Sequence, residues 1–258
     1  MDALTAIAAA PPAFRAETVA DAVAGQFGLQ GELHPLVSER DQNFRLEAGE
    51  QGRFLVKVSS ALESAATTAL QVDVLLHLAP CPEIIAPRVI RTLAGRTCGH
   101  VDDGETRLRL RVLSWVEGRQ LETVDVDAGM AARFGAALGQ LDAALACVAY
   151  AGENPVLLWD LQRLGDLRPL LRHVDDDALR DAVATAIDDY EIRVAPLQAD
   201  LPRQVIHADA NPENVLTAGD RIGFIDFSDI VTAPRVFDVA IAASYLRSGG
   251  SDPVSYTH

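Results

Sequence analysis

Carboxylate, amide and imidazole side chains gather in one stretch of the chain, residues 204–229. A short apolar β-run ends at His207 and Asp209, and Asn214 follows five residues after Asp209. Oxygen ligands of this kind suit a hard cation such as Mg²⁺, which takes one or two carboxylates and leaves its other positions to water and phosphate oxygens. A further carboxylate can orient a hydroxyl group and accept its proton. The stretch therefore has the chemistry for phosphoryl transfer.

The chain after Asn214 is predicted to form a hairpin. Apolar, β-type residues flank the turn sequence Ala-Gly-Asp at 218–220. Asn214 and Asp226 are symmetric about residue 220, so folding there would place their side chains side by side at the open end. We therefore expect Asp209, Asn214 and Asp226 to converge. The alternative, an Asn- and Asp-rich turn whose polar groups cap backbone amides, explains the whole string less well.

A single lysine is the next candidate. Of the 22 basic residues only Lys57 is a lysine, and it lies near the end of a predicted strand, 54–58. A lysine that remains where arginine otherwise serves is a candidate for a specific role. A second predicted strand, 107–113, carries a row of arginines that we interpret as a solvated face. The row comprises Arg107, Arg109 and Arg111.

The elements that must position these residues divide into two parts. Apolar residues spaced by three and four, or alternating, mark the helices and strands. The predicted helices are 16–29, 62–78, 134–148, 179–194 and 239–246, and the predicted strands are 44–46, 54–58, 88–93 and 107–113. The first part is strand-rich and the second helical, which predicts a bilobal α+β protein. We expect a lobe at 1–113, a hinge at 114–119 and a second lobe at 120–258.

Composition bounds the function. The chain has 258 residues, is 49% hydrophobic and carries a formal charge of −15. It has enough apolar material for a core, and its acidity argues against nucleic acid or an anionic membrane surface as a partner. The three cysteines have no metal or disulfide spacing. Without a basic leader or a long uncharged apolar segment, the sequence predicts a cytoplasmic location.

The stretch His207-x-Asp209-x-x-x-x-Asn214, followed by Asp226-Phe-Ser, resembles the catalytic loop and metal-binding segment of the aminoglycoside phosphotransferase and choline kinase superfamily. That superfamily is related to the protein kinases, whose pattern is H-R-D-x-x-x-x-N with D-F-G. The residues Ser-Glu-Arg-Asp-Gln-Asn-Phe at 38–44 are similar to the hydroxylysine kinase-like branch. The resemblance implies a protein-kinase-like fold, with a small N-terminal lobe built on an antiparallel sheet and a larger, mostly helical C-terminal lobe.

The resemblance also assigns roles. Asp209 is the expected catalytic base, Asn214 and Asp226 are the expected Mg²⁺ ligands, and Lys57 is expected to bind the phosphates. The turn at 38–43 occupies the place of the loop that covers the phosphates.

Four further positions follow from the same match. Ser114 and Val116 are expected in the hinge whose backbone meets the purine. His207 and Asp238 are expected to support the catalytic loop rather than to react.

The helix residue expected to pair with Lys57 departs from the protein-kinase pattern. Protein kinases pair their lysine with a glutamate of the next helix. In this chain Gln71 holds the best-matching position, and Asp73 lies on another face of that helix. We expect Gln71 to orient Lys57 by one hydrogen bond; if Lys57 had no anionic partner, the affinity for the nucleotide would be modest.

The function that follows is a small-molecule kinase. It would transfer the γ-phosphoryl group of ATP or GTP to a hydroxyl of an amine-bearing metabolite, with Mg²⁺. Asp160 and Asp229 are weak candidates to face a cationic acceptor. Hydroxylysine or an ethanolamine-like amino alcohol leads, and an aminoglycoside, choline or homoserine follows.

A second hypothesis is a non-catalytic nucleotide-binding pseudokinase or regulatory domain, as in a fragment of a kinase–phospho-lyase fusion. We also expect the C-terminus to be truncated, which would leave an apolar helix face exposed. The oligomeric state cannot be inferred from the sequence.

Overall fold

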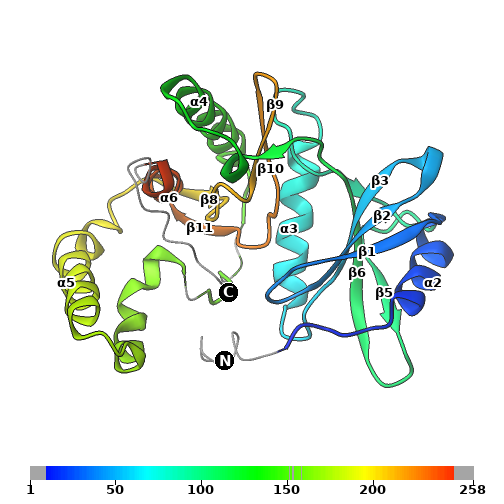
Figure 1. Cartoon of the computed structure of the whole chain (residues 1–258), viewed down its shortest axis with the longest axis horizontal. Coiled ribbons are helices and arrows are strands. Elements are labelled where there is room, and N and C mark those ends of the chain that lie inside the picture. The colour runs from blue at the N-terminus through cyan, green and yellow to red at the C-terminus, as the bar shows by residue number, and fades with distance from the viewer. Residues whose placement is uncertain (1–9, 151, 153, 158, 247–258) are drawn as a thin grey trace. The chain divides into compact units, whose positions relative to one another are not determined.

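The computed structural model describes residues 10–246 apart from 151, 153 and 158 (Figure 1). Helices separate groups of consecutive strands along this length. In chain order they are α2 (Ala16–Phe27), β1 (Glu32–Leu36), β2 (Gln42–Glu47), β3 (Arg53–Val58), α3 (Ala65–Leu78), β4 (Val89–Ile90), β5 (Gly99–Asp102), β6 (Arg107–Ser114), β7 (Arg119–Gln120), α4 (Ala128–Leu145), η3 (Leu161–His173), α5 (Asp177–Arg193), β8 (Arg203–Ile206), β9 (Val215–Ala218), β10 (Arg221–Phe224), β11 (Val231–Pro234) and α6 (Val236–Leu246).

The chain forms two compact units. The N-terminal unit comprises Ile7–Asp125 together with Pro212–Phe227, and the C-terminal unit consists mainly of Val126–Asn211 and Ser228–His258. The expected lobe boundary at 113 and hinge at 114–119 therefore differ from this division. The reason is strand pairing, because β7 pairs with β9 and so ties the connector and the β9–β10 hairpin to each other.

An antiparallel sheet organises the N-terminal unit. Its strand order is β1-β2-β3-β6-β4, and β5 also pairs with β6. Side chains alternate between the two faces of each strand, so Phe54, Val56 and Val58 share one face of β3. They join a core with Val19 and Phe27 of α2. Helix α2 therefore covers the apolar face of the sheet.

The opposite face of the sheet carries Lys57. Helix α3 lies on that side, across the sheet from α2 (Figure 1). Ser64 begins α3 as its N-cap, since its hydroxyl accepts a hydrogen bond from the Thr67 amide at 2.9 Å. The helix buries Gln71 as well as its apolar residues, whereas Asp73 is exposed. A polar layer thus lies between α3 and the sheet.

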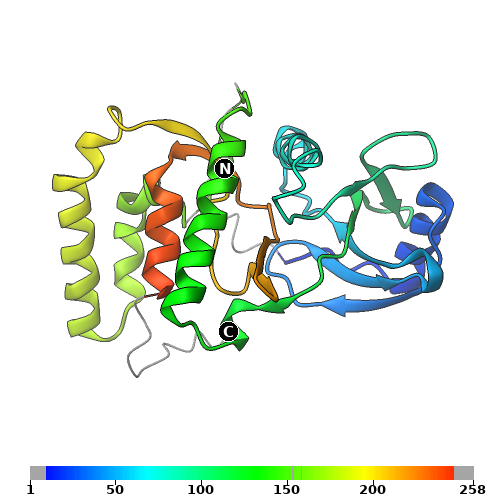
Figure 2. The ribbon, with the colours of Figure 1, turned by 90° about the horizontal axis from the view of Figure 1, so that it is seen from above.

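Helices α4, α5 and α6 and the 3₁₀ segment η3 make up most of the C-terminal unit. Within it α6 lies beside α4 (Figure 2), and α5 packs against η3. The short strands β8 and β11 pair antiparallel, and their Ile206 and Val231 belong to the core of this unit. On α6, Val236 and Val239 are exposed. The predicted truncation concerns residues 247–258, which lie outside the described part.

The predicted helices are confirmed with shifted ends, and the strand predicted at 88–93 shortens to β4. The segment η3 was not predicted, because Pro169 and an irregular apolar pattern interrupt it. Among the residues described, no helix is both long and apolar enough to cross a bilayer.

Candidate active site

Lys57 on β3 is buried between two carboxylates. Its Nζ lies 3.0 Å from Oδ2 of Asp41 and 3.4 Å from Oδ1 of Asp226. Burial alone would lower the pKa of Lys57, but Asp226 and Asp41 outweigh that effect, so the pKa lies above its ordinary value. The two carboxylates therefore favour the charged form of Lys57.

Asp41 belongs to the turn that precedes β2. Its side chain is 7% exposed, and its Oδ1 accepts a hydrogen bond from the Ser60 amide at 2.8 Å while Oδ2 faces Lys57. Burial would raise the pKa of Asp41, but Lys57 and the Ser60 amide more than compensate, and the pKa is lowered. The carboxylate thus joins the turn at 38–43 to the lysine of β3. The residue pattern did not predict this role, although Asp41 lies within the motif at 38–44.

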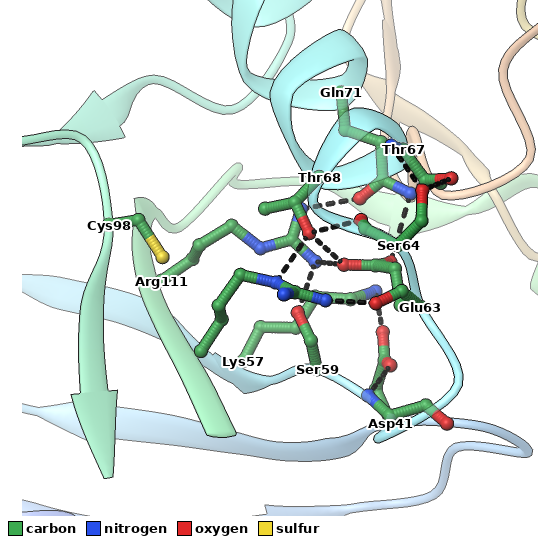
Figure 3. A network of polar contacts seen from close by, with 12 residues as sticks. Asp41, Lys57, Ser59, Glu63, Ser64, Thr67, Thr68, Gln71, Cys98 and Arg111 are labelled. Carbon is green, nitrogen blue, oxygen red and sulfur yellow. Dashed lines mark hydrogen bonds and ion pairs between the residues drawn. The ribbon is translucent and has the colours of Figure 1, made fainter. Parts of the chain in front are cut away.

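The arginine row of β6 is only partly solvated. Arg111 is buried, and its guanidinium donates to Glu63 at 3.2 Å and to the Ser59 hydroxyl at 3.0 Å (Figure 3). Arg109 donates to the Thr68 hydroxyl at 2.8 Å. Of the three arginines only Arg107 is exposed, so the interpretation of the row as a solvated face is wrong at Arg111. The sheet face is shielded there by α3, which a strand pattern by itself does not reveal.

Gln71 faces the same layer, but its amide group is engaged by other residues. Its Oε1 accepts from Arg111 and its Nε2 donates to Glu63 at 3.1 Å. Lys57 has an anionic partner, because Asp41 provides one from the preceding turn. Gln71 links helix α3 to the Arg111–Glu63 ion pair.

The hairpin formed by β9 and β10 has a register that differs by one residue from the predicted one. Val215 is opposite Phe224, and the Ile225 amide donates to the Asn214 carbonyl at 2.9 Å. Asn214 therefore faces Ile225 along the ladder, and Asp226 lies one residue beyond it. Asp226 has a φ of 55°, a left-handed conformation that costs about 1 kcal/mol for a residue with a side chain.

Asp238 of α6 holds the loop that begins at His207. Its Oδ2 accepts from the His207 amide at 2.8 Å and its Oδ1 accepts from the Ala208 amide at 2.7 Å. Ala208 is left-handed, with a φ of 64°. The two bonds to one buried carboxylate compensate for this strained backbone and fix the start of the loop. This geometry fits the supporting role expected for Asp238.

Asp209 follows directly in the same loop. Its amide donates to Nδ1 of His207 at 3.3 Å, and its Oδ1 accepts from the Asn211 side chain at 2.9 Å. His207 is fully buried, whereas Asp209 is half-buried. His207 therefore supports the loop, and Asp209 keeps a carboxylate near the protein surface. Asp209 belongs to the C-terminal unit, and Asn214, Asp226 and Lys57 belong to the N-terminal unit.

A second buried carboxyl group lies next to Asp238. Asp142 of α4 is 4% exposed, and burial and the neighbouring Asp238 raise its pKa to about 8. Asp142 is thus protonated at neutral pH and donates to Asp238, which accepts two amide bonds as the carboxylate. The burial of Asp142 could have been predicted from the sequence, since Asp142 follows Leu138 by four residues on the apolar face of the helix.

Some polar groups of the residues expected in the hinge already form hydrogen bonds within the protein. The Ser114 amide donates to the Arg88 carbonyl, and the Ser114 hydroxyl accepts from the Arg88 amide, both at 2.8 Å. The Trp115 amide donates to the Arg53 carbonyl at 3.1 Å. Ser114, Trp115 and Val116 line a hollow of about 370 Å³ that does not include Lys57. The amides of Ser114 and Trp115 are therefore engaged within the protein.

Asp160 and Asp229, the weak candidates for an acceptor site, both have structural partners. Asp160 begins η3 as its N-cap and accepts from the Gln162 amide at 2.9 Å. Asp229 accepts from the indole of Trp159 at 2.8 Å. Both side chains are buried, so the structure gives each a role in holding the fold.

The donor set fits a hard cation held by few protein oxygens. Within the part of the chain described, no three His, Cys, Asp or Glu side chains form a metal-binding cluster. Mg²⁺ needs no such cluster, because one or two carboxylates with water and phosphate oxygens suffice. Asp226 meets this requirement, since its side chain is 46% exposed and lies next to the Lys57 ammonium. Asp226 and the amide of Asn214 are thus the residues that would hold the ion.

Comparison with known proteins places the chain in a family. The profile of the phosphotransferase enzyme family matches residues 32–256. A hydroxylysine kinase of Danio rerio is 23% identical to this chain, and the match covers 92% of this chain and 71% of that kinase. A homoserine kinase of Brucella canis is 42% identical over 82 residues, which are 30% of this chain and 25% of that kinase. The solved structure of an amicoumacin kinase with AMP-PNP and Ca²⁺ superposes with a TM-score of 0.69 at 14% identity, covering 94% of this chain and 72% of that one. The chain belongs to the phosphotransferase enzyme family.

Proposed function

We propose that this protein is a small-molecule kinase that transfers the γ-phosphoryl group of ATP or GTP to a hydroxyl group of an amine-bearing metabolite. The observation that carries the proposal is the buried Lys57, a fixed cation 3.4 Å from the carboxylate of Asp226. A phosphate-binding cation beside a metal-binding carboxylate is the arrangement that phosphoryl transfer requires. The family membership supports the same reaction class.

The residues divide the work as follows. Lys57 binds phosphate oxygens of the nucleotide, and Asp226 and Asn214 are the residues that would hold Mg²⁺. When bound there, Mg²⁺ would supply positive charge against the negative charge that develops on the phosphates. Asp209 accepts the proton of the acceptor hydroxyl as its oxygen bonds to the γ-phosphorus. The bond from that phosphorus to the β-phosphate oxygen breaks, and the nucleoside diphosphate leaves.

Binding of the purine is assigned to the hinge. Because the amides of Ser114 and Trp115 are engaged by Arg88 and Arg53, we assign the backbone contact to Val116 and to the Ser114 carbonyl. Asp238 and His207 keep the loop that carries Asp209 in shape. Neither of them takes a proton in this scheme.

The acceptor proposed is an amino acid or amino alcohol that carries a hydroxyl group, with hydroxylysine first. The hydroxylysine kinase and homoserine kinase relatives support this class. The excess of acidic residues in this chain favours an acceptor with an ammonium group. Both carboxylate oxygens of Asp160 accept from Gln162, and Asp229 accepts from Trp159, so either residue would have to contact the acceptor in addition to these bonds.

The experiment is release of nucleoside diphosphate from Mg-ATP and Mg-GTP. The acceptors compared are 5-hydroxylysine, ethanolamine, homoserine, choline and kanamycin. Stimulation by one acceptor should fall by about a hundredfold to ten-thousandfold in Asp209→Asn. The matched control is Asp220→Asn, which removes an exposed carboxylate from the hairpin turn. A protein whose melting temperature rises with Mg-nucleotide but which stimulates no release with any acceptor would instead be a nucleotide-binding module.

A further inference from the structure

Two buried cations lie directly opposite each other in the sheet. Lys57 of β3 and Arg111 of β6 are register partners, so their side chains share one face. Lys57 is 5% exposed and Arg111 is 3% exposed. Like charges placed opposite each other away from water repel strongly unless each has its own anion. The structure therefore has to supply two carboxylates in this layer.

Each cation has a separate carboxylate (Figure 3). Glu63, which precedes α3, pairs with Arg111 at 3.2 Å and also accepts from the Thr68 hydroxyl at 2.6 Å. Asp41 pairs with Lys57 at 3.0 Å. The carboxylate at the N-terminal end of α3 thus serves the arginine, and the turn before β2 serves the lysine.

The two carboxylates next to Lys57 are not equivalent. Asp226 has a side chain that is 46% exposed, and its charge would be shared with Mg²⁺ in the reaction proposed above. Asp41 is 7% exposed and is fixed by the Ser60 amide at 2.8 Å. Asp41 is therefore the carboxylate that stays with Lys57 when a Mg-nucleotide is bound.

We propose that Asp41 is the positioning residue for Lys57, in place of the helix glutamate that orients the lysine in protein kinases. This inference rests on the proposed kinase function. Asp41 touches no substrate in this scheme; it holds the ammonium where the phosphates must meet it. Because Asp41 belongs to the turn at 38–43, the same contact couples that turn to the lysine.

The first test measures the NMR signal of the Lys57 side chain. Lys57 is the only lysine in the chain, so protein labelled with ¹⁵N and ¹³C in lysine gives one side-chain Nζ–Cε signal. The variant Asp41→Asn removes the charge but keeps an oxygen for the Ser60 amide. We expect the Lys57 signal to shift and broaden in this variant. It should stay unchanged in Asp73→Asn, which removes an exposed carboxylate from α3.

The second test separates positioning from stability. With Mg-ATP, Asp41→Asn should lower kcat/KM for the nucleotide about tenfold to a hundredfold, the size of a charge-assisted hydrogen bond, and leave KM for the acceptor unchanged. Asp41→Glu keeps the charge and should give values between Asp41→Asn and the wild type. If Asp41→Asn does not fold, Asp41→Glu replaces it in both tests.

The outcomes distinguish the two proposals. An unchanged Lys57 signal in Asp41→Asn overturns the positioning role, and so does tighter binding of Mg-ATP, because Asp41 would then compete with phosphate. A wild-type protein that neither binds Mg-nucleotide nor turns it over refutes the kinase proposal. In that case the Lys57 signal alone decides whether Asp41 fixes the lysine.

Discussion

Stability should decrease as the pH rises from about 4 to 8, because the fold keeps Asp142 protonated. Its pKa is raised from 3.8 to about 8, by burial first and by Asp238 second. Between these two values the folded chain holds a proton that the unfolded chain has released. The free energy of unfolding therefore falls with increasing pH in this window and levels off above about pH 8.

The size of the effect follows from linkage. One proton bound by the folded state alone gives a limiting slope of about 1.4 kcal/mol per pH unit. Asp142 lines a hollow of about 460 Å³ between α4 and α6, and solvent there would screen the carboxyl group. We therefore expect about half of the limiting slope, which amounts to about 1 kcal/mol between about pH 6 and 7.5.

Urea unfolding of the wild type and of Asp142→Asn at several pH values measures this slope. Asparagine is close in shape to the protonated acid and does not titrate, so the variant should lack this contribution and should exceed the wild type in stability above about pH 8. Asp220→Asn, at an exposed turn, should keep the slope of the wild type. Equal slopes in the wild type and Asp142→Asn would refute the assignment of the proton to Asp142.

The remaining predictions concern stability measured by urea or thermal unfolding. Glu63→Gln should destabilise by about 2–4 kcal/mol, because Arg111 would be left buried without its anion, whereas Glu105→Gln, at an exposed position, should stay within about 0.5 kcal/mol of the wild type. Equal effects of the two would contradict the buried ion pair. Gly135→Ala in α4 should stabilise by about 0.8 kcal/mol, since the added methyl group meets open space and favours the helix. Gly219→Ala should destabilise by about 1 kcal/mol although it too meets open space, since its φ is +64°; two changes of the same sign would refute the conformational argument.

Much of the candidate site could be predicted from local spacing. The string from His207 to Asp226 carries its residue types in a fixed order, and the lone Lys57 stands at the end of a strand whose alternation is plain. Those features depend on neighbours a few residues away, which the sequence displays directly. The supporting role of Asp238 is different: it follows only from the resemblance, because Asp238 lies in the first turn of α6, 30 and 31 residues from the two amides that it binds.

The hairpin shows where local reasoning reaches its limit. Symmetry about residue 220 predicts that Asn214 lies opposite Asp226. In the structure the ladder is shifted by one residue, so that Asn214 lies opposite Ile225. A turn sequence fixes the existence of a hairpin more firmly than its register. Asp226 consequently lies beyond the end of the ladder, where its backbone is left-handed.

The choice of ionic partners was decided only by the tertiary structure. Glu63 and Asp41 are the two carboxylates of this polar layer, and they lie 6 and 16 residues from Lys57 in the chain. Asp41 rather than Glu63 pairs with Lys57 because the packing of α3 buries Arg111 beside Glu63. The pairing of Asp142 with Asp238 likewise joins α4 to α6 across nearly a hundred residues. The sequence determined the residue types and their local order, and the tertiary structure selected the ionic partners, because desolvation forces each buried charge to find a counter-charge wherever the chain brings one.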